Sequence, residues 1–122
     1  ELEIRSICKY VKNTDLVLFP TSYKNESFPL VILESFMFGI PVFAYGNGAI
    51  SEMITKDYLG EVFNKDESNV HKKIAEKIEK LSKQNKSKRN KDSKKIREHF
   101  KKNYTLDVAG KGLIDIFNKE LK

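Results

Sequence analysis

The feature that most constrains the fold is an alternation between short apolar runs and segments with helical spacing. The runs at residues 15–20, 41–45 and 60–63 are too short to be helices. Such runs are typical of strands in a parallel sheet, and the first suits a strand buried on both faces. Because helical patterns separate the runs, the order predicts right-handed crossovers and an α/β fold. Three strands are fewer than the roughly five or six of a mean sheet, so we expect part of a doubly wound, Rossmann-like domain.

Helices are predicted between these strands and after them. Residues 30–38 are apolar almost all round, so we expect a buried helix there. Pro29 suits its first turn, and Gly39 is placed to end it in a left-handed cap. Ser51 can cap a short helix through Thr55. The other segments with helical spacing are residues 2–12, 70–81, 94–102 and 105–121, and residues 82–92 are predicted to be a polar break.

The chain of 122 residues is long enough for one domain. The predicted organisation is a single partial domain, with an α/β part at residues 1–70 and basic and C-terminal helices at residues 71–122. Because the sequence begins at Glu1 without methionine and contains few strands, we expect a piece of a longer protein. The single cysteine, Cys8, excludes an internal disulfide framework and a cysteine-rich zinc site.

The net charge of +6 is concentrated in one segment. Residues 1–70 carry six Lys/Arg against ten Asp/Glu, whereas residues 71–102 carry fourteen against four. A solvated lysine-rich surface is the favoured interpretation of this segment, followed by attraction to an anionic membrane surface. Nucleic acid ranks last, because Phe100 is the only aromatic residue there to stack on bases. His71 and His99 lie among the lysines and are expected to be solvated.

A ligand site is expected beyond the carboxyl ends of the first two strands. The loops at residues 21–28 and 46–50 should meet there, each leading into a helix N-terminus that favours anions. Glu26 precedes the buried helix and Glu34 follows eight residues later. A carboxylate in an apolar helix is costly to bury without a partner, and a ligand with vicinal hydroxyls would supply one. The spacing permits a nucleoside diphosphate without demanding one.

The sequence NESFPLVILESFMFGIPVFA at residues 25–44 resembles a known motif. It is similar to the E-x7-E segment of retaining glycosyltransferases of group 1, or family 4, which have the GT-B fold. The similarity extends to DLVLFPTS at residues 15–22, GNGAISE at residues 46–52 and YLGEVF at residues 58–63. It implies that the chain is the C-terminal half of a GT-B donor-binding lobe.

The resemblance also implies roles for particular residues. Glu26 would contact the hydroxyls of the donor sugar and is the candidate catalytic residue. Backbone amides of Ser27, Phe28 and Leu30 would hold the diphosphate, and Glu34 would bind the ribose hydroxyls. The implied chemistry is retaining transfer of a sugar from a nucleotide-diphospho-sugar, with no metal or other cofactor required.

Some positions depart from the family pattern. Ser27 and Pro29 stand where many members have glycine, and Pro29 has no N–H to offer a phosphate. Ala49 replaces a glycine and Ser51 a proline that are common in the next loop. These departures leave the number of phosphate contacts open.

The resemblance further implies partners that this chain lacks. The Arg and Lys that neutralise the diphosphate and the N-terminal acceptor-binding domain would lie upstream, so the isolated chain is expected to be inactive. The parent would be a hexosyltransferase-type enzyme that builds a polysaccharide or glycolipid. It would be cytoplasmic and peripheral to the inner face of the membrane.

An alternative from another class is a non-catalytic α/β module that docks on an anionic membrane or nucleic acid through residues 71–102. In the first interpretation, removal of the Glu34 carboxylate should weaken nucleotide binding. In the second, binding to vesicles or nucleic acid should depend on the positive charge of residues 71–102. In either case a truncated sheet has an exposed edge, so self-association of the fragment is expected.

Overall fold

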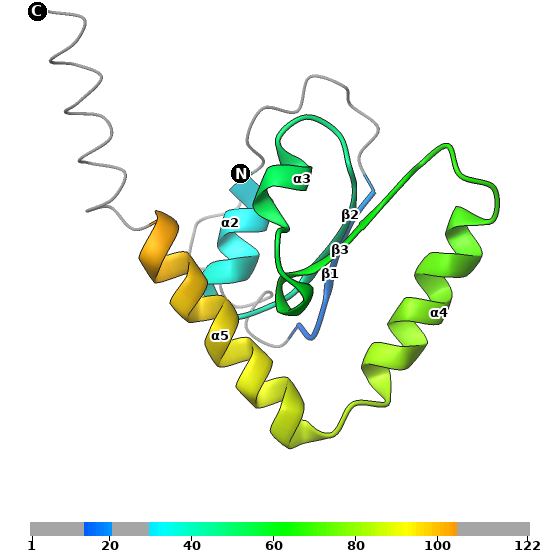
Figure 1. The fold of residues 1–122 in the computed structure, drawn as a ribbon. Coiled ribbons are helices and arrows are strands. Elements are labelled where there is room, and N and C mark those ends of the chain that lie inside the picture. Colours follow the sequence, from blue (N-terminus) through cyan, green and yellow to red (C-terminus); the bar gives the residue numbers. More distant parts are fainter. Residues whose placement is uncertain (1–13, 21–29, 105–122) are drawn as a thin grey trace, which may run out of the picture.

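The computed structural model describes residues 14–20 and 30–104 (Figure 1). Its strands are β1 (Val17–Phe19), β2 (Val42–Tyr45) and β3 (Gly60–Phe63). Its helices are α2 (Leu30–Met37), α3 (Ile50–Met53), α4 (Val70–Ser82) and α5 (Lys86–Tyr104), with a 3-10 turn, η1 (Asp57–Leu59). The predicted helix at residues 2–12, the loop at residues 21–28, Cys8, Pro29 and the helix from Thr105 lie outside the described residues.

The three strands form one parallel sheet in the order β1-β2-β3. Val42 is the register partner of Val17 on one side and of Gly60 on the other. All three predicted strands are confirmed, and so is the parallel α/β arrangement. The sequence pattern did not predict η1, which precedes β3.

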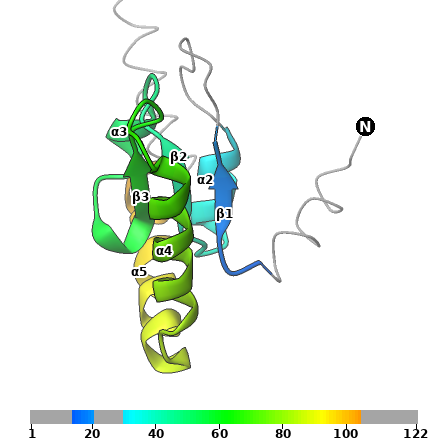
Figure 2. The ribbon, with the colours of Figure 1, turned by 90° about the vertical axis from the view of Figure 1, so that its right-hand side faces the viewer.

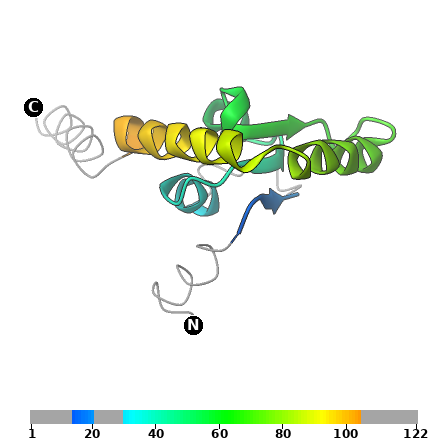
Figure 3. The same ribbon diagram turned by 90° about the horizontal axis from the view of Figure 1, so that it is seen from below.

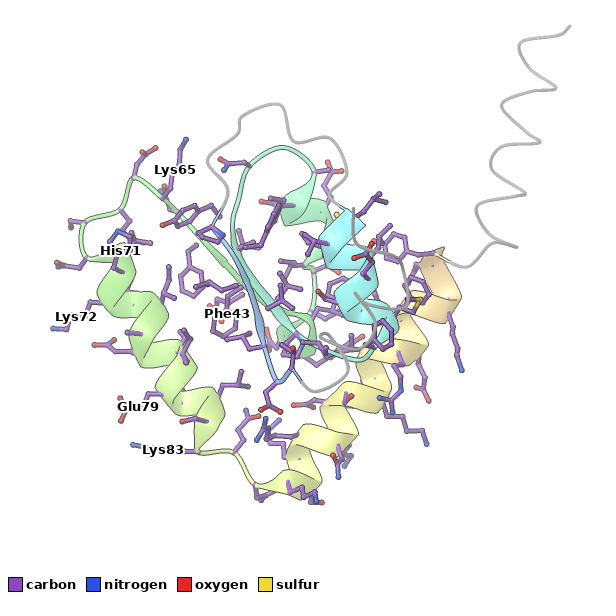
Figure 4. All side chains as sticks on the ribbon, turned by 180° about the vertical axis from the view of Figure 1, so that it is seen from behind. Phe43, Lys65, His71, Lys72, Glu79 and Lys83 are labelled. Atoms are coloured by element: carbon purple, nitrogen blue, oxygen red, sulfur yellow. The ribbon has the colours of Figure 1, made fainter. Side chains whose placement is uncertain are left out.

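Side chains of β2 alternate between two cores on opposite faces of the sheet. Val42 and Ala44 belong to the core that α2, α3 and α5 cover. Phe43 belongs to the other core, where its ring meets Phe63 edge-on at 5.6 Å between centroids. Figure 4 shows Phe43 between the strands and α4. In Figure 1, α4 accordingly lies on one side of the strands and α2 with α5 on the other.

Two predicted elements are less buried than expected. Leu18 in β1 is 48% exposed, and Leu30 and Met37 in α2 are 67% and 42% exposed. β1 is an outer strand among those described, so it lacks the cover that β2 has on both faces. α2 turns only one side toward the sheet, with Ile32 and Phe36 fully buried. The prediction that these elements are buried on all sides is therefore wrong.

The end of α2 follows the prediction closely. Gly39 has a φ of 73°, in the left-handed region. Its N–H donates to the carbonyl of Phe36, and the N–H of Ile40 donates to that of Ser35, both at 2.9 Å. This pair of bonds is the Schellman arrangement, which satisfies the last carbonyls of a helix. The predicted cap of α3 is wrong, because Ala49 occupies the cap position in place of Ser51, and no side chain bonds there.

α4 and α5 form a V that is joined by a short link (Figure 1), and seen from below they run end to end (Figure 3). The stripe predicted on α4 is confirmed, because Val70 and Ile74 are buried and Ile78 and Leu81 pack beside them. The predicted break at residues 82–92 is wrong beyond residue 85, since α5 begins at Lys86. The side-chain oxygen of Asn85 accepts the N–H of Lys88 at 2.8 Å, a helix cap that local polarity alone did not indicate. Figure 2 is seen from the α4 side, with α5 behind it.

His99 lies in an aromatic cluster that holds α5 against the rest of the fold. Its ring meets Phe36 edge-on at 6.1 Å, Tyr58 at 6.5 Å and Tyr104 at 6.0 Å between centroids. The prediction of a solvated His99 is therefore wrong, whereas His71 is exposed as expected. Helical periodicity puts His99 next to Ile96 on the packed side of α5, and the surrounding lysines obscured this in the sequence.

Gly60 is required where β3 begins. Its φ of 135° and ψ of −149° lie in a region that only glycine occupies readily. A Cβ at this position would also overlap the backbone of Val42 on the central strand. The close parallel pairing of β2 with β3 thus depends on the missing side chain.

We expect Gly60→Ala to lower the free energy of unfolding by more than about 3 kcal/mol, through strain and backbone overlap. Gly48→Ala is the matched control. Its φ of 55° is also positive, so the strain of the left-handed conformation alone should cost about 1–2 kcal/mol. Urea unfolding followed by circular dichroism measures both values, and failure of Gly60→Ala to fold is the extreme of the same result. Equal costs for the two variants would contradict this account.

His99 should make stability depend on pH. Burial, followed by the positive charges of Lys56 and Lys102, lowers the pKa of His99 from its ordinary value of 6.5. The unfolded chain therefore binds this proton more readily, so stability is complete above about pH 6.5 and is lost as the pH falls below it.

Thermal unfolding between about pH 7.5 and about pH 5.5 should show this loss, and His99→Gln should flatten it over the same range. If the stability of His99→Gln still falls over this pH range as it does in the unsubstituted chain, other groups cause the pH dependence.

The outer strands predict self-association. β1 and β3 are the outer strands of the described sheet, and each presents unpaired backbone groups on its outer side. Sedimentation velocity of the 122-residue chain should therefore show mass increasing with concentration. A monomer throughout the concentration series would be the opposite result.

Candidate functional site

The carboxyl ends of β1 and β2 lie together at one edge of the sheet. Phe19 is the register partner of Ala44, which is in turn the partner of Val62. Pro20 and Gly46 therefore leave the sheet at the same edge, as the sequence predicted. Glu26, Ser27 and Phe28 belong to the segment at residues 21–29, which lies outside the described residues.

Leu30 and Glu34 are the predicted site residues that the structure describes, and both lie on α2. Leu30 is the first residue of the helix, and Glu34 follows one turn later on the same side. Met37 continues this side, whereas Ile32, Ser35 and Phe36 form the buried side. Glu34 thus belongs to an outward stripe of α2 rather than to the core.

The Glu34 carboxylate is half-buried and has no hydrogen bond or ion pair with any residue that the structure describes. The neighbouring Ser35 differs, since its hydroxyl donates to the carbonyl of Val31 at 2.7 Å. A partly desolvated carboxylate without a partner is costly, and hydroxyl donors from a ligand would offset that cost. Glu34 therefore retains its full acceptor capacity.

Backbone hydrogen bonds hold the loop after β2. The N–H of Gly46 donates to the carbonyl of Phe63 at 3.1 Å, which extends the pairing with β3. The carbonyl of Asn47 accepts the N–H of Ile50 at 3.1 Å. Glu52, in the first turn of α3, is exposed. A carboxylate at this position is a favourable partner for the helix dipole, as the sequence indicated.

A large cavity lies at the opposite edge of the sheet, where the sequence predicted no site. Its volume is about 820 Å³, and its walls come from the beginnings of the three strands and the first half of α5. Two ion pairs line it, Arg89 with Asp15 and Lys88 with Asp92. Leu30 and Glu34, the predicted site residues that the structure describes, do not line it. A cavity formed by non-consecutive elements leaves no signal in local sequence.

The described ranges contain neither a metal-binding cluster nor a helix that could span a membrane. Residues 14–20 and 30–104 contain no group of three His, Cys, Asp or Glu side chains arranged to hold a metal ion. Over the same ranges, no helix is both long and apolar enough to cross a membrane.

A parallel sheet with helices on both faces, and loops that gather at its carboxyl edge, defines a Rossmann-like α/β domain. Residues 3–110 match the sequence profile of the family described as Glycosyl transferases group 1. Because the match covers most of the chain, the protein belongs to the group 1 glycosyl transferases. No individual curated protein matches the sequence significantly.

Proposed function

We propose that this chain is the donor-binding part of a retaining glycosyltransferase of the family 4 kind. The parent enzyme would transfer a sugar from a nucleotide-diphospho-sugar. The observation that carries the proposal is the half-buried, unpartnered Glu34, one turn into a helix that begins near the carboxyl edge of the sheet. Family membership supplies the class of reaction.

The geometry of α2 suits a nucleoside diphosphate. Leu30 and Glu34 are four residues apart, or about 6 Å along the axis at about 1.5 Å per residue. A diphosphate at the N-terminus would receive unpaired N–H groups and the positive end of the helix dipole. The ribose would then lie beside Glu34, whose carboxylate can accept both vicinal hydroxyls.

The remaining roles follow from the E-x7-E motif. Glu26 is proposed as the catalytic group that faces the donor sugar beyond the phosphates. Backbone N–H groups of Ser27, Phe28 and Leu30 are proposed as diphosphate donors, and Pro29 cannot be one. These donors would stabilise the charge that develops on the leaving diphosphate, typically a large contribution to catalysis. The proposal needs no metal or other cofactor.

The proposal extends to the parent protein. Cations upstream of residue 1 would complete diphosphate binding, and an N-terminal domain would hold a polysaccharide or glycolipid acceptor. The parent would be a hexosyltransferase on the cytoplasmic side of the membrane. The 122-residue chain alone would therefore be inactive.

The competing interpretation, a non-catalytic module, has less support. Membership of a transferase family favours an enzyme. The proposed donor site at the carboxyl edge of the sheet uses no residue of the basic helices. Those helices are better treated as a separate surface of the same enzyme.

Glu34→Gln should weaken binding of nucleotide-diphospho-sugars to the full-length protein by roughly 10- to 100-fold, because a charged hydrogen-bond acceptor is lost. Isothermal titration with uridine, guanosine and adenosine diphospho-sugars measures the effect and identifies the base. Glu52→Gln is the control, since Glu52 is an exposed carboxylate that follows the other loop at the same edge. Undiminished binding by Glu34→Gln would remove the basis of the proposed site.

A further inference from the structure

The two basic helices differ in how their charge is compensated. Three lysines of α4 and its C-terminal end have carboxylate partners: Lys73 with Glu67, Lys77 with Glu61 and Lys83 with Glu79. Figure 4 shows Lys72 and Glu79 pointing outward from α4, so positive and negative charges share that surface. α5 carries nine Lys/Arg against two acids. The net positive charge of the basic segment is therefore mostly on α5.

Apart from Lys86 in the first turn, the lysines of α5 that form no ion pair with a described residue lie on one side of the helix. Each is exposed and has no carboxylate partner among the residues that the structure describes. Helical geometry places them within about 120° of the circumference and about 17 Å of the length. We call this set the lysine face: Lys91, Lys94, Lys95, Lys101 and Lys102.

Packing fixes which way the lysine face points. Ile96 is 1% exposed and belongs to the main core, and Phe100 packs against it. Arg97 bonds to Ser93 at 2.8 Å, close to Gly39 at the end of α2. Because these contacts fix the packed side of α5, the lysine face lies on the solvent-exposed side of the helix.

We propose that the lysine face docks on the anionic lipid headgroups of a membrane surface. A straight helix touches a plane along its whole length, so Lys91, Lys94, Lys101 and Lys102 can reach headgroups together, whereas Lys95, at the margin of the face, has its Nζ 5.8 Å from the centre of the Tyr58 ring. Lysine ammonium groups are flexible point charges, which suit a diffuse negative surface that offers no fixed geometry. The net charge of −4 on residues 1–70 would turn the rest of the domain away from such a surface.

Nucleic acid fits this surface less well. The lysine face contains neither arginine nor an aromatic residue, so it lacks the bidentate and stacking groups that usually read nucleic acids. A duplex is also a cylinder, and a straight helix meets it over a shorter length than it meets a plane. Lipid headgroups are therefore the occupant that the surface favours, and this inference does not depend on the proposed donor site.

The test is sedimentation of the 122-residue chain with phosphatidylcholine vesicles that contain or lack phosphatidylglycerol. We expect binding only with phosphatidylglycerol, falling steeply as salt is added. Each lysine near the membrane surface raises the partition coefficient about fivefold. The double variant Lys94→Gln with Lys101→Gln should therefore bind the vesicles roughly 30-fold more weakly. Lys72→Gln with Lys80→Gln on α4 changes the net charge equally and should have an effect of less than about threefold.

A variant that gains binding makes the test independent of losses caused by misfolding. Glu98 is the exposed acid in the middle of the lysine face, so Glu98→Lys should strengthen vesicle binding by roughly tenfold or more. Nucleotide-sugar binding by the full-length protein should be unchanged in all these variants, which separates this inference from the donor site.

Three results would overturn the proposal. The first is no vesicle binding at low salt, and the second is an equal loss in the α4 and α5 double variants. The third is binding to duplex DNA at least as tight as binding to the vesicles, lost in the same α5 variant. That last result would assign the lysine face to nucleic acid.

Discussion

The fold depends on a central strand that must be apolar on both faces. β2 pairs with β1 and β3, and its side chains alternate between two separate cores. Val42 and Ala44 require cover from α2, α3 and α5, whereas Phe43 requires cover from α4. Burial of one such side chain contributes about 1.5–3 kcal/mol, so leaving either face open would be costly. The chain must therefore send helices to both sides, and α4 and α5 divide between them.

This division connects the candidate donor edge with the basic surface. α2 has one side in the core and another that carries Glu34. α5 packs against the buried side of α2 through Ile96 and His99, which leaves its lysines facing outward. Gly39 allows the close approach, because a side chain there would collide with Ser93 and Arg97. The packing of α2 on α5 thus holds two helices, one carrying the proposed donor-site residue Glu34 and the other the proposed membrane surface.

The polar groups of the domain fall into two kinds. Several are paired within the chain, such as Asp15 with Arg89 and Lys77 with Glu61, and these serve the fold. Glu34 and the lysine face have no such partners in the described part of the chain. Charge that a protein leaves uncompensated is available for a ligand or a surface, and both proposals rest on that difference.

Local pattern determined the parallel three-strand sheet, the end of α2 at Gly39 and the stripe on α4, and it carried the resemblance to group 1 glycosyl transferases that the family match confirms. Each of these depends on neighbouring residues and their spacing. Tertiary structure alone decided that α2 buries one side, that α5 begins at Lys86, and that His99 packs among aromatic rings. It also decided which lysines are neutralised and where the large cavity lies. The physical reason is that burial and charge pairing are properties of residues brought together from distant parts of the chain, and no local spacing encodes which partner each will meet.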